Sequence, residues 1–183
     1  MKKESRILGI SASETIGKQI AVIGVVFRGN QWLDGIIVCH LRPLNPDNVS
    51  ALARAIIKCK QYSQIHAVIL ASERFSPRTR IDMTALSNVI NRPIIMIVRS
   101  RSRQIGKHQK RSRSTLPNYY RVKLSGKSLS VLATKLSFTE TSEILSLACV
   151  NGSMMPEAVR VAQLIAHHAS DLYAFKLQRA LVI

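Results

Sequence analysis

Arginine and serine alternate through one segment of this chain, and phosphate binding is the chemistry that the pattern favours. Residues 99–113 read RSRSRQIGKHQKRSR, with no hydrophobic periodicity. A guanidinium can pair with two phosphate oxygens at once, and the intervening serines keep the chain flexible and add hydrogen bonds. The segment cannot bury one face, so we predict an extended arm that becomes ordered on binding RNA.

Two further groups of side chains extend this basic segment. Tyrosines beside basic residues at 119–123 can stack on unpaired bases, and three arginines follow a predicted strand near residue 70. The alternatives are a solvated loop for the charged run and core packing for the tyrosine pair. The candidate nucleic-acid-binding residues are Arg74, Arg78, Arg80, Arg99, Arg101, Arg103, Lys107, Lys110, Arg111, Arg113, Tyr119, Tyr120, Arg121 and Lys123.

The net charge of the chain predicts a polyanionic partner. There are 27 Lys and Arg against 10 Asp and Glu, a formal charge of +17, and no acid occurs between Met83 and Thr139. Such a field attracts nucleic acid. An anionic membrane is the alternative, but the sequence has no basic helix with a large apolar face and no apolar run of about 18 residues. We therefore expect nucleic acid, RNA rather than DNA, and no membrane contact.

Other patterns that carry chemistry are missing from the sequence. Ser11 and Ser13 have no His or Asp at the spacing of a nucleophile motif. Cys39, Cys59 and Cys149 are far apart, which argues against a zinc site or a disulfide and favours reduced core thiols in a cytoplasmic protein. We expect no catalytic residue, no metal and no cofactor.

Apolar segments of strand length alternate with amphipathic segments of helix length. We expect strands at 6–11, 20–28, 31–41, 66–71 and 94–98, and weaker ones at 120–124 and 129–134. We expect helices at 47–57, 82–90, 139–150 and 156–179. Asp82 is the predicted N-cap of the second helix, and Thr139 or Thr141 that of the third.

The order of these elements predicts an α/β fold. Three strands in an antiparallel meander, with a tight turn at Gly29-Asn30, are followed by βα units. This order gives a mixed sheet in which the meander joins parallel strands, with helices on the faces. We expect a single domain over 1–183, a basic insertion at about 99–118, and a C-terminal helical tail at 170–183 that ends in apolar residues.

Three motifs resemble an archaeal family known as domain of unknown function ninety-nine. They are GVVFRG at 24–29, WLDG at 32–35 and MPEAVRVAQLIA at 155–166, and the resemblance covers roughly residues 6–169. That family is similar to endonuclease V and shares its ribonuclease-H-like fold. The resemblance implies a five-stranded mixed sheet flanked by helices, and a nuclease site in which carboxylates hold divalent ions.

The chain departs from the family pattern at three site positions. Family members carry Gly-Ile-Asp-Asp at the end of the first strand, Leu-Asp-Gly after the fourth strand, and Ala-His in the last helix. Ser11, Ala71 and Gln163 stand at the corresponding positions here. None of them supplies the anionic oxygen that Mg²⁺ prefers.

Four other acids lie where they could rebuild such a site, namely Glu14, Asp34, Glu73 and Asp82. Asp34 lies in the WLDG motif, where we expect it to hydrogen-bond to the backbone. Glu73 adjoins Arg74, and we expect a solvated ion pair between them. We expect no metal site from these residues.

These observations lead to the prediction that the chain is not an enzyme. We predict a non-catalytic RNA-binding protein, a ribosomal component that binds ribosomal RNA through the arginine-rich arm beside neighbouring ribosomal proteins. The alternative is a metal-dependent, endonuclease V-like nuclease that acts on modified or damaged nucleic acid with relocated acids. A third hypothesis is a protein-interaction module that uses the apolar end at 180–183.

Overall fold

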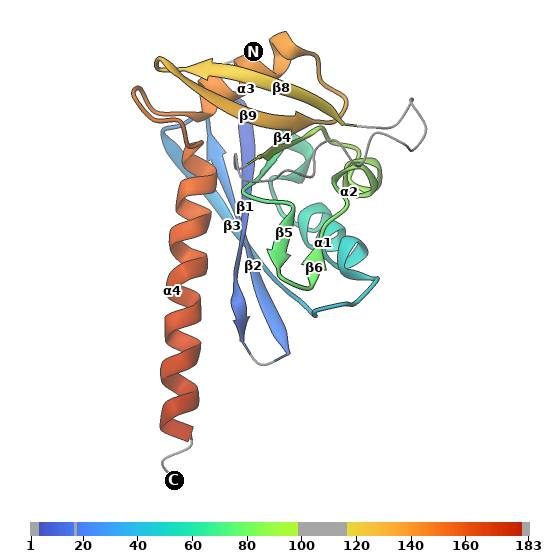
Figure 1. Cartoon of the computed structure of the whole chain (residues 1–183), viewed down its shortest axis with the longest axis vertical. Coiled ribbons are helices and arrows are strands. Elements are labelled where there is room, and N and C mark those ends of the chain that lie inside the picture. Colours follow the sequence, from blue (N-terminus) through green and yellow to red (C-terminus); the bar gives the residue numbers. More distant parts are fainter. Residues whose placement is uncertain (1–3, 17, 99–116, 181–183) are drawn as a thin grey trace.

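The computed structural model describes residues 4–16, 18–98 and 117–180, with the side chains of Ile16 and of residues 170–180 left out. The predicted arm at 99–113 and the last three residues of the apolar tail lie outside this description. The described residues form one large sheet with helices on both faces, and the last helix runs alongside the first two strands (Figure 1).

The sheet is mixed, as predicted, and has the order β3-β2-β1-β4-β7-β9-β8. An antiparallel meander forms one half: β1 (Arg6–Ile16), β2 (Gln19–Arg28) and β3 (Trp32–Leu41). Next to β1, two strands run parallel to it: β4 (Ile65–Leu70) and β7 (Ile94–Ile97). The strands β4 and β7 are almost wholly buried, which explains their continuous apolar sequences.

A hairpin extends the sheet to seven strands, two more than the resemblance implied. β8 (Asn118–Leu124) pairs with β9 (Lys127–Ala133), and β9 pairs antiparallel with β7. Ser125 and Gly126 form its turn with positive φ angles of 48° and 79°. The two weaker strand predictions are thereby confirmed, and they form an edge of the sheet.

Helices cover both faces of the sheet and enclose separate apolar clusters. α1 (Asn48–Ile57) and α2 (Met83–Val89) pack with Leu8, Ile10, Val68 and Leu70 on one face. α3 (Phe138–Ala148) and the start of α4 (Glu157–Ala180) pack with Ile7, Ala67 and Ile69 on the other. Because side chains alternate along a strand, odd-numbered residues of β1 and β4 face α3 and α4.

Helix α4 lies unusually close to β1, and Gly9 is the reason. A Cβ atom built on Gly9 would lie 2.3 Å from the carbonyl carbon of Ala158 and 2.4 Å from the nitrogen of Val159. Ala158, Ala162 and Ala166 are buried along the same side of α4. Small residues on both partners therefore set the depth at which the helix packs.

Several local details differ from the sequence predictions. The N-cap of α3 is Ser137, because its side chain accepts a hydrogen bond from the Glu140 amide while the Glu140 carboxylate accepts one from the Ser137 amide. The predicted caps Thr139 and Thr141 lie inside the helix. A short hairpin of β5 (Arg74–Ser76) and β6 (Thr79–Arg80) was not predicted, whereas the Asp82 cap of α2 is confirmed.

The three cysteines are free thiols, as expected. Burial raises the pKa of Cys39 and of Cys149 to about 11, so both are protonated at neutral pH. Within the described part of the chain, no helix is both long and apolar enough to cross a membrane.

Candidate functional site

A pocket opens where the parallel pairing of β1 and β4 ends, and it brings together the three positions at which the sequence departs from the family pattern. Its volume is about 210 Å³. The residues that line it, called here the Ser11 pocket, are Ser11, Ala12, Ala71, Ser72, Arg74, Phe75 and Gln163.

Strand register explains why Ser11 and Ala71 meet. β1 and β4 pair in parallel up to Ile10 opposite Leu70, and the Ala71 amide then donates a hydrogen bond of 2.9 Å to the Ile10 carbonyl. The next residue of β1 is Ser11, which points to the same face as Gly9. Helix α4 packs on that face, so Gln163 reaches the same pocket.

Several polar groups in the Ser11 pocket have no partner in the part of the chain that the structure describes. Within the described residues, the Ser11 hydroxyl, the Gln163 amide and the Arg74 guanidinium make no hydrogen bond or ion pair. The Ser72 hydroxyl accepts a bond of 3.1 Å from the Arg74 amide and can still donate its proton. Hydrogen-bond donors therefore dominate the lining of the pocket. The one charged side chain among the lining residues is that of Arg74, a cation.

Glu73 lies between two lining residues but is engaged elsewhere. Its carboxylate forms an ion pair with Arg80 at 2.8 Å, across the β5–β6 hairpin. The predicted ion pair between Glu73 and Arg74 is therefore wrong. Among the described residues, Glu73 therefore balances the charge of Arg80, and no acid forms an ion pair with Arg74.

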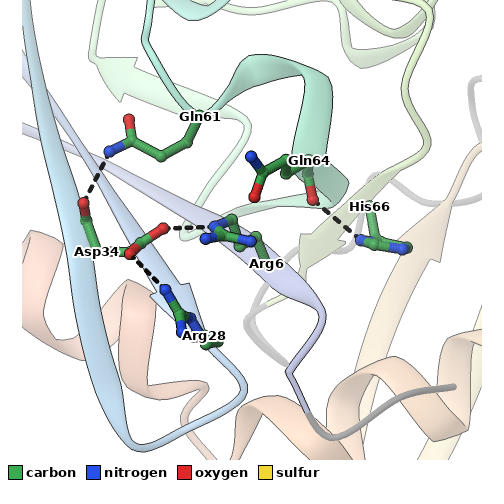
Figure 2. A network of polar contacts seen from close by, with 6 residues as sticks. All are labelled: Arg6, Arg28, Asp34, Gln61, Gln64 and His66. Carbon is green, nitrogen blue, oxygen red and sulfur yellow. Dashed lines mark hydrogen bonds and ion pairs between the residues drawn. The ribbon is translucent and has the colours of Figure 1, made fainter.

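Asp34 does not line the pocket, and two arginines hold its carboxylate (Figure 2). Its carboxylate accepts a short hydrogen bond from Arg6 and another of 3.1 Å from Arg28, while its backbone carbonyl accepts one of 2.7 Å from Gln61. The hydrogen bonds from Arg6 and then Arg28 outweigh the effect of burial and lower the pKa of Asp34. The predicted backbone role of the Asp34 side chain is wrong. Arg6 precedes Ser11 by five strand residues, roughly 16 Å.

The two remaining acids also lie outside the pocket lining. The Asp82 carboxylate accepts hydrogen bonds of 2.9 and 3.0 Å from the first turn of α2. Glu14 has an exposed side chain further along β1. Across 4–16, 18–98 and 117–180 there is no group of three or more His, Cys, Asp or Glu side chains that could hold a metal ion. The side chains that line the Ser11 pocket include a guanidinium and no carboxylate. They therefore do not fit a divalent cation, which carboxylates would hold.

The structure places the predicted nucleic-acid-binding arginines near residue 70 in different environments. Arg74 lines the Ser11 pocket. Arg78 lies exposed in the turn of the β5–β6 hairpin, and Arg80 pairs with Glu73. Of these three arginines, only Arg74 therefore lines the pocket.

The predicted residues on β8 divide between its two faces. Tyr119, Arg121 and Lys123 are exposed, whereas the Tyr120 hydroxyl donates to the Leu136 carbonyl at 3.1 Å. The Tyr120 ring also packs edge-to-face on Phe138, with a centroid separation of 5.7 Å. Tyr120 therefore contributes to core packing, which the sequence analysis gave as the alternative to base stacking. The exposed strip lies on the α1 and α2 face, opposite α4.

Sequence reasoning overlooked three lining residues, Ala12, Ser72 and Phe75. Ser72 lies in the loop after β4, and loops after the carboxyl ends of parallel strands commonly bind ligands. That rule could have identified Ser72. Phe75 is buried in the core and shapes the pocket wall.

Comparisons with known proteins identify a family for this chain. A family model described as Endonuclease dU matches residues 3–170. A UPF0215 protein of Methanosarcina barkeri is 32% identical over 100 residues, 55% of this chain and 52% of the relative. A UPF0215 protein of Methanothermobacter thermautotrophicus is 26% identical over 181 residues, 91% of this chain and 88% of the relative. The chain spans about half the length of the Methanosarcina relatives that it matches.

Solved structures show the same fold at low sequence identity. A protein of unknown function from Archaeoglobus fulgidus has a TM-score of 0.71 at 17% identity, covering 88% of this chain and 95% of its own. Endonuclease V of Bacillus subtilis has a TM-score of 0.61 at 11% identity, and the match covers 93% of this chain and 82% of the Bacillus chain. Ciona intestinalis endonuclease V, in complex with a 24mer DNA containing an inosine followed by a ribo-adenosine, has a TM-score of 0.57 at 15% identity, covering 88% and 84%. The predicted endonuclease V-like family and ribonuclease-H-like fold are confirmed.

The same findings correct the functional prediction. The prediction of a non-catalytic ribosomal RNA-binding protein that is not an enzyme was wrong, because the chain matches the model of a family described as Endonuclease dU and shares its fold with endonuclease V. None of the names of these relatives and neighbours describes a ribosomal protein. The physical reason for the error is that positive charge attracts every polyanion, so composition does not distinguish ribosomal RNA from the substrate of a nuclease.

Proposed function

Because this chain belongs to the endonuclease dU family, we propose that it acts on nucleic acid as an endonuclease V-like nuclease, with the strand crossing the Ser11 pocket. The observation that carries the proposal is the meeting of Ser11, Ala71 and Gln163 in one open pocket. These residues come from β1, the end of β4 and α4, and they occupy the positions where the family pattern has its site.

The charge of the chain supports a nucleic-acid substrate. A formal charge of +17 draws polyanions toward the molecule, and the pocket presents Arg74 with hydroxyl and amide donors. The chain's own groups can bind and orient a phosphodiester there. Since the pocket does not fit a divalent cation, binding and orientation are the roles that its side chains support.

We propose that basic residues outside the pocket form a second, separate contact with nucleic acid. Tyr119, Arg121 and Lys123 form an exposed aromatic and basic strip on β8, suited to a flexible strand. We propose that the arm at 99–113, beside that strip in the sequence, binds phosphates. Replacing four of its arginines by glutamine should reduce the slope of log affinity against log salt by about 0.7–0.9 per lost contact.

Binding and cleavage assays on the full chain test the proposal. The substrates are single- and double-stranded oligonucleotides of DNA and RNA, unmodified or carrying deoxyuridine or inosine. Each is incubated in EDTA, Mg²⁺ or Mn²⁺ at constant ionic strength and resolved on denaturing gels, with binding measured by anisotropy. We expect binding at low salt and strand cleavage that Arg74→Gln reduces. Binding with no cleavage under any condition would remove the nuclease assignment, and a lack of binding would remove the whole proposal.

A further inference from the structure

We propose that the Ser11 pocket binds the non-bridging oxygens of a nucleic-acid phosphodiester directly, through Arg74, Ser11 and Gln163, without an intervening divalent cation. This inference rests on the proposed function, because it specifies how the substrate is held. It assigns an anion-binding role to a place where a carboxylate-based nuclease holds cations.

The charge arrangement around Arg74 is the first observation that carries the inference. Arg74 and Arg80 are cross-strand partners in the β5–β6 hairpin, so two positive side chains stand opposite each other. Glu73 pairs with Arg80 at 2.8 Å. No acid lines the pocket, and Arg74 is the residue there whose charge lacks a protein counterion within the described residues. An anion in the pocket would supply that counterion.

The uncharged lining groups are the second observation. Ser11 lines the pocket and is 7% exposed, and its hydroxyl has no hydrogen-bond partner in the described part of the molecule. The Gln163 amide is likewise unpartnered, and the Ser72 hydroxyl retains its proton to donate. Partly desolvated donors bind a charged acceptor more strongly than a neutral one. A phosphate offers several acceptor oxygens, and these groups approach it from β1, the end of β4 and α4.

The position of the pocket is the third observation. Gly9 lets α4 sit directly on β1, so Gln163 and Ser11 are held by packed elements rather than by a loop. Arg74 extends an exposed side chain from the β5–β6 hairpin beside them. The Ser11 and Gln163 donors are positioned before binding, so they lose little conformational freedom when the ligand arrives. The pocket therefore needs no cation to organise it.

Anisotropy titrations of a labelled oligonucleotide in EDTA test the inference. Arg74→Gln is compared with Arg54→Gln, which removes the same charge from an exposed residue on α1, across the sheet from α4. Arg74→Gln should weaken binding about tenfold or more, and Arg54→Gln by about twofold or less. Arg74→Lys should recover part of the loss, because lysine keeps the charge but lacks the planar fork. Ser11→Ala should weaken binding about threefold or more.

Addition of Mg²⁺ at constant ionic strength should leave the wild-type affinity unchanged. Equal losses for the two arginine variants, or wild-type binding that requires Mg²⁺, would overturn the inference and leave the proposed function standing. A wild-type chain that binds no nucleic acid would instead remove the proposed function itself.

A second experiment, with inorganic phosphate, identifies the ligand. Phosphate should raise the melting temperature of the wild type more than that of Arg74→Gln and should compete with the oligonucleotide. Stabilisation by phosphate, without any difference between the arginine variants in oligonucleotide binding, would assign the pocket to free phosphate and overturn the phosphodiester assignment. Circular dichroism of each variant confirms that it is folded.

Discussion

The backbone amide of Ala71 donates a 2.9 Å hydrogen bond to the carbonyl of Ile10, and this bond places Ala71 beside Ser11 on the face of the sheet that α4 covers. Both side chains are 7% exposed and line the same pocket as Gln163. The backbone therefore holds positions 11 and 71 side by side. Carboxylate side chains at these two positions would form a cation site.

Restoring carboxylates at these two positions should create a metal site. In Ser11→Asp/Ala71→Asp the two acids lie side by side and partly buried, so their repulsion should destabilise the metal-free protein. Mg²⁺ at ten times its dissociation constant should then stabilise the variant by about 1.4 kcal/mol. Thermal melts with and without Mg²⁺ measure this effect. We expect no such shift in the wild type, and an equal shift in both proteins would contradict our description of the pocket.

The close packing of α4 on β1 should make Gly9 intolerant of any side chain. In Gly9→Ala the new methyl group meets the backbone of Ala158 and Val159, which cannot move without displacing the helix. We expect a loss of roughly 3 kcal/mol or more in the free energy of unfolding, measured by urea titration. Gly126→Ala is the control, because nothing lies within 4 Å of its Cβ position and only its φ of 79° opposes the change. Its cost should be about 1 kcal/mol, and equal costs would show that α4 packs differently.

The hydrogen bonds from Arg6 and Arg28 should make stability depend on the charge of Asp34. The folded state lowers the pKa of Asp34, so its contribution is full above the unfolded pKa of about 3.9 and is lost as pH falls through the lower folded value. Asp34→Asn should cost about 1.5–3 kcal/mol at pH 7 and flatten the acid limb of the stability curve. Urea titrations between pH 2 and 7 measure both effects. Asp47→Asn, at an exposed carboxylate, should change stability by less than about 0.5 kcal/mol.

Two variants should distinguish Ser137, the observed N-cap of α3, from Thr139, a cap that the sequence suggested. Ser137→Ala removes the side-chain acceptor for the Glu140 amide and should cost about 1 kcal/mol. Thr139→Ala, at an exposed position within the first turn, should be neutral or slightly stabilising, because alanine has the higher helix propensity. Thermal or urea unfolding measures both variants. A larger loss for Thr139→Ala would contradict the assigned cap.

Much of the fold could be predicted from local sequence patterns. The meander, the two parallel strands and the four helices follow the apolar periodicity, and the Asp82 cap follows from its position before Met83. Predictions from local patterns were wrong where two nearby residues could each have capped a helix or formed an ion pair. Ser137 caps α3 in place of Thr139, and Glu73 pairs with Arg80 across a hairpin in place of its neighbour Arg74.

By itself, the sequence determined the order of the four helices and of the strands of the large sheet, the positive charge and the family, because periodicity, composition and motifs can be read from the chain without its tertiary contacts. Only the tertiary structure decided that Ser11, Ala71 and Gln163 share a pocket with Arg74, and that Asp34 binds Arg6 from 28 positions away. Those relationships depend on strand register and on the depth at which α4 packs over Gly9. Both arise from contacts between segments far apart in the sequence, which no local pattern records.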